Sequence, residues 1–320
     1  MFLKSKLKGE KAKLIVVLTA LVLMGCGGVR NGNVANSAPT QVQMRVLTDD
    51  FGRTVTVPVK IMRVVSLAPS LTENIFAVGA GDRLVGVTTF CNYPEAAKSI
   101  AKIGDTMNPN MESIVALKPD VVFVSTASQI EAFMKTLEAN GIAVYVTNPS
   151  GLRDLYKNLE QLGIIFDSNE TARGVVSKLD DREFYVRERC GTVPIADGNP
   201  PVEKLVRVFV QISKEPLFTI GKNSFLNEIV SIAGGKSVTA NIESAYPKLS
   251  KETASALSPD AIILSESEDN NEPNEVFKNS PAVKNGRVYK VNADLLSRPG
   301  PRLVDALEQI ARDLHPEKFK

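Results

Sequence analysis

The chain contains MESIVALKPDVVFVS at residues 111–125 and KETASALSPDAIILS at residues 251–265, and the two stretches are identical at six of fifteen positions. Each pattern predicts a short helix, a Pro-Asp turn and a buried apolar strand. Connections of this kind are common in α/β proteins, so the likeness could also be convergent. In either case, both halves of the chain contain the same local order of helix, turn and strand.

Around this repeat, short apolar runs alternate with stretches of helical spacing, which predicts parallel sheets covered by helices. The expected strands are 63–67, 84–88, 121–125, 143–147, 206–212, 261–265 and 288–291, and the expected helices are 71–78, 111–117, 129–140, 224–233, 251–257 and 302–314. A weaker likeness relates residues 70–79 to residues 224–234. Each of these segments has a polar start, an amphipathic helix with a glutamate and a glycine stop.

The middle of the chain separates two such sets of elements. Residues 167–190 are strongly charged and contain no proline, which predicts one long surface helix, and the Pro- and Gly-rich residues 191–201 end it. We therefore predict an α/β fold with an N-terminal lobe at 45–166, a linking helix at 167–191 and a C-terminal lobe at 192–320. Each lobe is expected to hold a central, mainly parallel sheet.

The first residues have the layout of a secretory signal, with five lysines followed by an apolar run at 14–23. That run is too short for a stable membrane span. It ends in Leu23-Met24-Gly25-Cys26, which resembles the cleavage site of bacterial lipoproteins. We expect a signal peptide at 1–25, a lipid on Cys26 and a flexible tether at 26–44, although an ordinary signal peptide with an incidental cysteine is the alternative. The chain is then exported and lipid-anchored, in the periplasm or on the outer face of the cell membrane.

Charge and metal-ligand composition exclude several classes of partner. Without residues 1–25, 33 Lys and Arg stand against 35 Asp and Glu, so the net charge is −2 and no nucleic-acid partner is expected. The single histidine, His315, rules out a histidine-rich metal site, and no metal ligands are predicted. Cys91 and Cys190 lie far apart in sequence, and two separate thiols are favoured over a disulfide.

Five segments carry a resemblance to a known family. They are RVVSLAPSLTENIFAVGAGDRLVGVTTFCNYP at 63–94, MESIVALKPDVVFVS at 111–125, GKNSFLNEIVSIAGG at 221–235, SAYPKLSKE at 244–252 and SRPGPRLVDALEQIA at 297–311. Together they resemble the periplasmic solute-binding proteins of cobalamin, siderophore and haem importers, especially the cobalamin branch. The resemblance implies two lobes bridged by a rigid helix, a ligand cleft between them and delivery of the ligand to an ABC permease with its ATPase. It also implies a monomer.

The same resemblance suggests which residues meet the permease. Glu112 and Glu252 occupy matching positions of the repeat and match the family's docking glutamates, one per lobe, which pair with arginines of the permease. Both also fall in the first turn of a predicted helix, where a carboxylate is favourable on its own account. The two roles are compatible.

For the cleft, the resemblance points to loops at strand ends. Phe90 and Tyr93 fall in such a loop of the first lobe, and Phe218, Tyr246 and Arg298 fall in loops of the second. Aromatic faces would cover a flat macrocycle, and an arginine would bond its peripheral amides or carboxylates. Phenylalanines and tyrosines are also common packing residues. The expected ligand is a corrinoid, with a ferric siderophore or haem as the alternative, and no further cofactor is expected. Cobalamin binders often use tryptophans here, and this chain has none.

An enzyme is the main competing class, and the sequence argues against it. Residues 79–81 follow a predicted helix and precede the strand that contains Gly86, which reverses the order of a dinucleotide-binding loop, so Gly79 is expected to be a helix stop. No phosphate-binding loop, nucleophile elbow or zinc-protease motif occurs. The carboxylates of Asp49 and Asp50 are expected on a solvated surface. No catalytic residue is therefore predicted.

Overall fold

The computed structural model describes residues 42–125, 130–193 and 205–320. The predicted signal peptide, Cys26 and nearly all of the predicted tether lie outside these residues. Residues 42–320 pack as one unit and are described here by themselves.

The first lobe is built on a four-stranded parallel sheet in the order β4-β3-β5-β6. Its strands are β3 Val64–Ser66, β4 Leu84–Val87, β5 Val121–Ser125 and β6 Ala143–Thr147, and its helices are α1 Pro69–Ala77, η1 Gly81–Arg83, η2 Glu95–Ser99, α2 Met111–Ala116 and α3 Ile130–Ala139. Gly79 follows α1 with a φ of 81°, so it is the expected helix stop. The strand segments are apolar because both faces of a parallel sheet are covered.

The second lobe repeats this arrangement with a sheet in the order β11-β10-β7-β8, in which β9 also pairs with β7. All pairings are parallel except that of β7 with β8. The strands are β7 Val206–Ser213, β8 Phe218–Thr219, β9 Gly235–Ser237, β10 Ala261–Glu266 and β11 Val288–Asn292. The helices are α6 Leu226–Ile232, α7 Lys251–Ser255, η3 Glu275–Phe277, α8 Pro281–Lys284, α9 Ala293–Ser297, α10 Leu303–Leu314 and η4 Pro316–Phe319.

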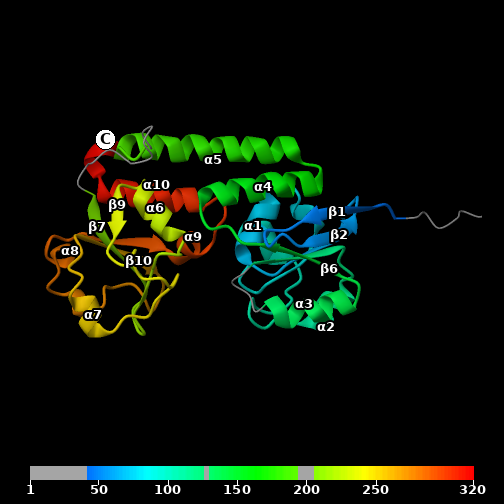
Figure 1. Cartoon of the computed structure of the whole chain (residues 1–320), viewed down its shortest axis with the longest axis horizontal. Coiled ribbons are helices and arrows are strands. Elements are labelled where there is room, and N and C mark those ends of the chain that lie inside the picture. Colours follow the sequence, from blue (N-terminus) through cyan, green and yellow to red (C-terminus); the bar gives the residue numbers. More distant parts are fainter. Residues whose placement is uncertain (1–41, 126–129, 194–204) are drawn as a thin grey trace, which may run out of the picture. The chain divides into compact units, whose positions relative to one another are not determined.

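Two helices between the lobes form the backbone of the fold. The helix α4, Leu152–Phe166, leaves the first lobe, the chain turns at Asp167 with a φ of 55°, and α5, Asn169–Cys190, runs back along it. Figure 1 shows α5 along the top of the view, with α4 and α10 beneath it. A Cβ on Gly163 would overlap the methyl group of Ala172 at 2.5 Å, so glycine permits the close approach of α4 and α5. The predicted fold class is confirmed; the lobe boundaries stay predictions.

The two copies of the sequence repeat also share backbone dihedral angles and hydrogen bonds. Lys118 and Ser258 both precede the Pro-Asp pair with positive φ, 45° and 47°. The amides of Asp120 and Asp260 each donate a 2.8 Å hydrogen bond to a backbone carbonyl of the neighbouring strand segment. The helix, turn and strand predicted for each copy are confirmed as α2 with β5 and α7 with β10.

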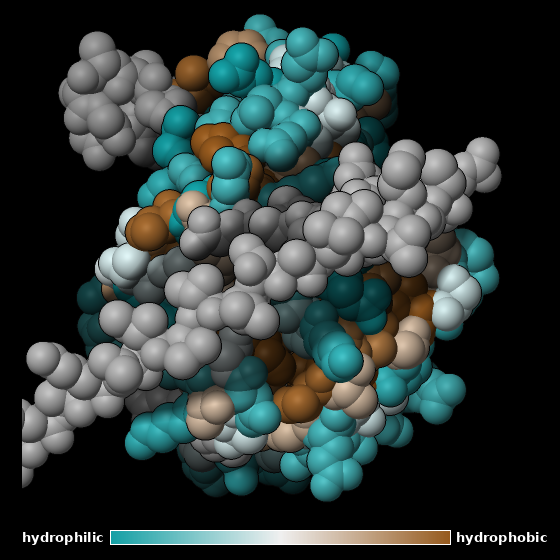
Figure 2. All heavy atoms as spheres, turned by 90° about the vertical axis from the view of Figure 1, so that its right-hand side faces the viewer, coloured by the Kyte–Doolittle hydropathy of each residue, from teal (hydrophilic) through white to brown (hydrophobic). Residues whose placement is uncertain are grey.

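A hairpin that was not predicted precedes the first lobe. Strands β1, Met44–Thr48, and β2, Thr54–Pro58, pair antiparallel, and Met44 and Val46 are among its exposed apolar side chains. Figure 2 views this end of the molecule and shows apolar surface among polar side chains. The expectation of a solvated Asp49 is wrong, because Asp49 is 5% exposed, accepts hydrogen bonds from the amides of Phe51 and Arg53 and pairs with the Arg53 guanidinium at 2.6 Å.

Two negative findings concern the described residues. Cys91 and Cys190 are both buried and do not form a disulfide with each other. Across ranges 42–125, 130–193 and 205–320, no helix has both the length and the apolar character that a membrane crossing requires.

Candidate functional site

A cavity of about 870 Å³ lies between the two lobes. Its walls include residues at the carboxyl ends of strands from both sheets, namely Ser125 of β5, Thr147 of β6, Ile212 next to the end of β7 and Ser265 of β10. Open parallel sheets bind ligands beyond the carboxyl ends of their strands. The volume of the cavity is in the range of sites that bind small molecules and cofactors. The cavity is therefore the candidate binding site.

The cavity wall combines apolar side chains with neutral polar groups. Hydroxyl and amide groups come from Ser70, Thr106, Ser125, Thr147, Asn148, Ser150, Asn223, Tyr246, Ser265 and Ser297. Among the described residues that line it, only Asp294 and Arg298 carry a charge. Such a wall can exchange hydrogen bonds with many neutral groups of a ligand while presenting almost no net charge.

Aromatic side chains enter from both lobes. Phe90, 59% exposed, follows β4 in the first lobe, and Tyr246, 41% exposed, and Phe225 come from the second. Desolvation raises the pKa of the Tyr246 hydroxyl, although a hydrogen bond with Ser224 partly opposes it. Phe225 was not predicted, because its place before an amphipathic helix gives the same pattern as a packing residue.

The structure brings together three of the five predicted cleft residues. Phe90, Tyr246 and Arg298 line the cavity. Tyr93 does not line it and instead lies under the Arg302 guanidinium, 4.0 Å from ring centroid to the guanidinium carbon. Phe218 does not line it either, because it lies in β8, where it pairs with β7 and bridges to Lys248.

A buried glutamate that was not predicted joins the lobes beside the cavity. Glu73 of α1 in the first lobe pairs with Arg298 at 3.0 Å and Arg302 at 2.6 Å in the second lobe. Its side chain is 2% exposed, and hydrogen bonding to Glu73 raises the pKa of the Arg302 guanidinium. One carboxylate from one lobe thus holds two cations from the other.

A second glutamate makes the reciprocal connection. Glu228 of α6 in the second lobe accepts a 2.9 Å hydrogen bond from the amide of Leu152, at the start of α4 in the first lobe. A carboxylate is favourable at the start of a helix. A Cβ on Gly151 would collide with this carboxylate, so glycine leaves the room it needs. Glu73 and Glu228 are the glutamates of the two similar segments 70–79 and 224–234. The likeness of these segments was the signal in the sequence that could have identified both residues.

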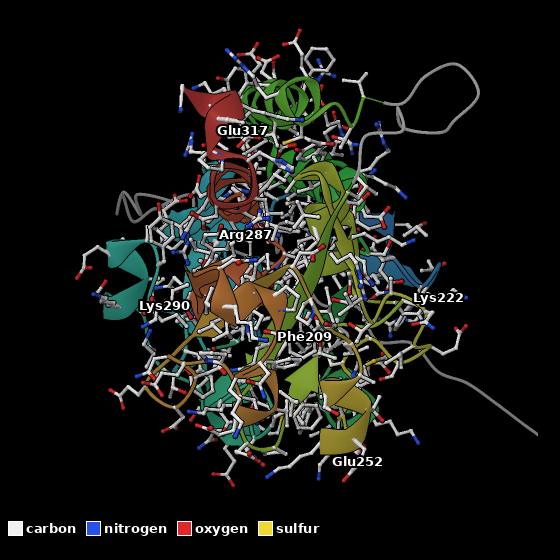
Figure 3. All side chains as sticks on the ribbon, turned by 90° about the vertical axis from the view of Figure 1, so that its left-hand side faces the viewer. Phe209, Lys222, Glu252, Arg287, Lys290 and Glu317 are labelled. Atoms are coloured by element: carbon white, nitrogen blue, oxygen red, sulfur yellow. The ribbon has the colours of Figure 1, made fainter. Side chains whose placement is uncertain are left out.

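Glu112 and Glu252 lie on the outer surface of their lobes. Each is exposed in the first turn of its helix, α2 or α7, whose N-terminus is capped by the side chain of Asn110 or Ser250. Figure 1 shows both helices on the side away from α5, and Figure 3 shows Glu252 at the end opposite Glu317. A hydrogen bond from its own backbone amide and one from Ser250 lower the pKa of Glu252, so it stays anionic.

A buried amide network supports the cavity wall in the second lobe. The Gln211 amide donates to Asn270 Oδ1 at 2.7 Å, and Asn270 Nδ2 donates to the carbonyls of Ser265 at 2.8 Å and Gln211 at 3.1 Å. Both side chains are almost completely buried. The network ties the ends of β7 and β10 to the loop that follows β10.

We expect Asn270→Ala to lower the free energy of unfolding by about 2–3 kcal/mol, because it removes one hydrogen-bond partner from the buried Gln211 amide and from several buried carbonyls. Urea denaturation would measure the change. Asn140→Ala is the matched control, since Asn140 is exposed and donates to a single carbonyl, that of Thr136. Equal losses in the two variants would contradict the structural role of the network.

Within the described ranges, no group of three or more His, Cys, Asp or Glu residues is arranged to hold a metal ion. His315 lies by the backbone of Gly234, with Nε2 3.3 Å from the carbonyl oxygen, and is absent from the residues that line the cavity.

Comparison with known proteins shows a consistent set of relatives. A sequence model of the periplasmic binding protein family matches residues 64–295. Over 312 residues, the chain is 31% identical to the "Uncharacterized ABC transporter substrate-binding lipoprotein YvrC" of Bacillus subtilis (strain 168), with 95% of this chain and 96% of that protein covered. Over 254 residues, it is 31% identical to a "Vitamin B12-binding protein" of Vibrio vulnificus (strain YJ016), with 78% and 89% covered.

A solved structure of a binding protein also matches the fold of this chain. The periplasmic vitamin B12 binding protein BtuF of Vibrio cholerae superposes with a TM-score of 0.68 at 27% sequence identity, and the match covers 81% of this chain and 99% of that one. The similarity therefore extends over both lobes.

Proposed function

This chain belongs to the periplasmic binding protein family and is a solute-binding protein of an ABC importer, and from that premise we propose that its ligand is a corrinoid. The family binds solutes for transport and is not a class of enzymes. The observation that carries the proposal is a large, nearly neutral cavity between two lobes, with aromatic side chains from each.

The chemistry of the wall suits a corrinoid. A corrin is a broad, mostly apolar macrocycle whose rim carries several carboxamide groups. Phe90 and Tyr246 offer aromatic surface from opposite lobes, and the surrounding hydroxyl and amide groups can bond rim amides as donors or acceptors. The vitamin B12-binding relatives support the same ligand class.

The two alternative ligands fit the wall less well. Haem iron in such proteins needs an axial Tyr, His or Met, and Tyr246 is the one such residue among those that line the cavity. Anionic ferric siderophores would favour a cationic wall, whereas Arg298 is already paired with Glu73 and Asp294.

Isothermal titration tests the ligand. We expect the soluble protein, starting at Gly27, to bind cyanocobalamin and cobinamide saturably with one site per chain, and not to bind haem or a ferric siderophore. If the protein binds haem or a siderophore but neither cyanocobalamin nor cobinamide, the proposed corrinoid ligand is wrong, while the importer role is unaffected.

We expect Tyr246→Ala to weaken cyanocobalamin binding roughly tenfold, since an aromatic contact contributes up to about 1.5 kcal/mol beyond its buried area. Tyr246→Phe keeps the ring and should stay close to wild type. Tyr185→Ala is the control, because Tyr185 has the same 41% exposure but lies on α5. Titration of all three variants with cyanocobalamin decides the point: an unchanged affinity for Tyr246→Ala removes this residue from the site.

Export and docking complete the proposal. We propose that Cys26 carries a lipid and holds the protein, as a monomer, at the outer face of a membrane; a relative named as a lipoprotein supports this. The chain then delivers its ligand to a permease and ATPase, with Glu112 and Glu252 as the docking residues. Their exposure and matching positions on the two lobes support this role.

A further inference from the structure

The guanidinium of Arg298 lines the cavity, but its two terminal nitrogens are already engaged by the protein. They contact four acceptors: Glu73 Oε1 at 3.0 Å, Asn92 Oδ1 at 2.7 Å, the Phe90 carbonyl at 3.3 Å and Asp294 Oδ1 at 2.6 Å. A bidentate carboxylate partner needs both terminal nitrogens, or one of them with Nε. Arg298 is therefore poorly placed to capture a carboxylate of a ligand.

The charges around Arg298 also balance. Arg298 and Arg302 carry two positive charges, and Glu73 and Asp294 carry two negative ones. Exposure differs sharply across this group. The side chain of Asp294 is 35% exposed, whereas that of Arg298 is 8% and that of Glu73 is 2% exposed. Of the two charged residues that line the cavity, the anionic Asp294 is therefore the more exposed one.

We propose that Glu73 and Asp294 make the cleft selective for ligands whose rim groups are amides, and that they exclude ligands with carboxylates at the same place. Glu73 acts from the first lobe by neutralising the arginines, and Asp294 acts at the cavity surface. This inference rests on the proposed corrinoid function and concerns which corrinoids bind.

The physical basis is the difference between an amide and a carboxylate next to Asp294. A carboxylate oxygen of Asp294 can accept another hydrogen bond from a ligand N–H group, because each oxygen has two lone pairs. A ligand carboxylate has no N–H to donate and is repelled by the like charge. Inside a partly dry cleft the repulsion is much stronger than in water.

The test compares cyanocobalamin with its monocarboxylic acids, in each of which one rim carboxamide is hydrolysed to a carboxylate. We expect wild-type protein to bind at least one of these acids about tenfold more weakly than the parent amide, as measured by isothermal titration at neutral pH. In Asp294→Asn and Asp294→Ser, that difference should shrink to about threefold or less, because the like charge is gone.

The matched control is Asp305→Asn. Asp305 is also in the first turn of a helix and pairs with an arginine, Arg182 at 2.7 Å, but it is absent from the residues that line the cavity. This variant should keep the wild-type discrimination. Thermal unfolding of each variant establishes that it is folded before titration, and the two neutral replacements of Asp294 guard against the failure of either one.

Two outcomes overturn the inference alone: wild-type protein that binds every acid as well as the amide, or neutral Asp294 variants that keep the full difference. Both leave the corrinoid function standing, because the amide still binds. If wild-type protein binds neither the amide nor the acids, the proposed function fails, and the inference fails with it.

Discussion

Replacing Glu73 by glutamine will lower the free energy of unfolding by about 3–5 kcal/mol, because the change leaves two arginines next to a neutral side chain in a buried interface. Glu73 contacts Arg298 and Arg302 at 3.0 Å or less, and its side chain is 2% exposed. The glutamine has nearly the same shape, so lost packing contributes little. Denaturation with urea or guanidinium chloride gives the change directly.

A surface ion pair provides the matched comparison for this prediction. Glu95 pairs with Lys98 at 2.7 Å, but its side chain is 85% exposed. Glu95→Gln should change stability by less than about 1 kcal/mol, since exposed pairs contribute little. If Glu73→Gln is as mild as Glu95→Gln, the connection between the lobes does not depend on this carboxylate.

Reversing the charge of both proposed docking glutamates, as in Glu112→Lys with Glu252→Lys, will reduce ligand uptake at least tenfold and leave ligand affinity unchanged. Opposed like charges at a protein interface cost several kcal/mol, whereas both side chains lie outside the cavity. Uptake of labelled corrinoid by cells that carry the cognate importer measures delivery, and titration of the purified variant measures binding. Each single variant should fall between the double variant and wild type.

The control for charge reversal is Glu170→Lys. Glu170 is also an exposed first-turn glutamate, but it begins α5, on the opposite side from α2 and α7 (Figure 1). It therefore reproduces the loss of a favourable helix-terminal charge without touching the expected docking surface. Uptake that persists in the double variant, or that is lost equally in Glu170→Lys, contradicts the docking role.

Most strands of the two sheets could be predicted, because they form largely buried apolar runs, but β8 and β9 of the second sheet were not predicted. The strand expected at 121–125 coincides with β5, and the one expected at 143–147 coincides with β6. The hairpin β1 and β2 was not predicted, since it leaves apolar residues such as Val46 exposed. The helix α4 was also missed, although its buried leucines recur at helical spacing.

The cavity residues were harder to predict than the fold. Phe90 and Tyr93 stand three positions apart in one loop, yet only Phe90 lines the cavity, because the conformation of the loop directs each ring differently. The pairing of Glu73 with Arg298 joins residues 225 positions apart. No local pattern encodes such a contact, since it depends on how the two lobes meet.

The two reciprocal glutamate contacts between the lobes limit how proteins with this fold can acquire new ligand preferences. Each lobe contributes a carboxylate whose partners belong to the other, Glu73 for Arg298 and Arg302, and Glu228 for the start of α4. If one lobe were replaced by that of a homologue, its glutamate would lack partners in the other lobe unless the other lobe already contained suitable residues. The halves are thus not interchangeable modules, and new ligand preferences in this lineage should arise by substitution within the cleft rather than by recombination of whole lobes.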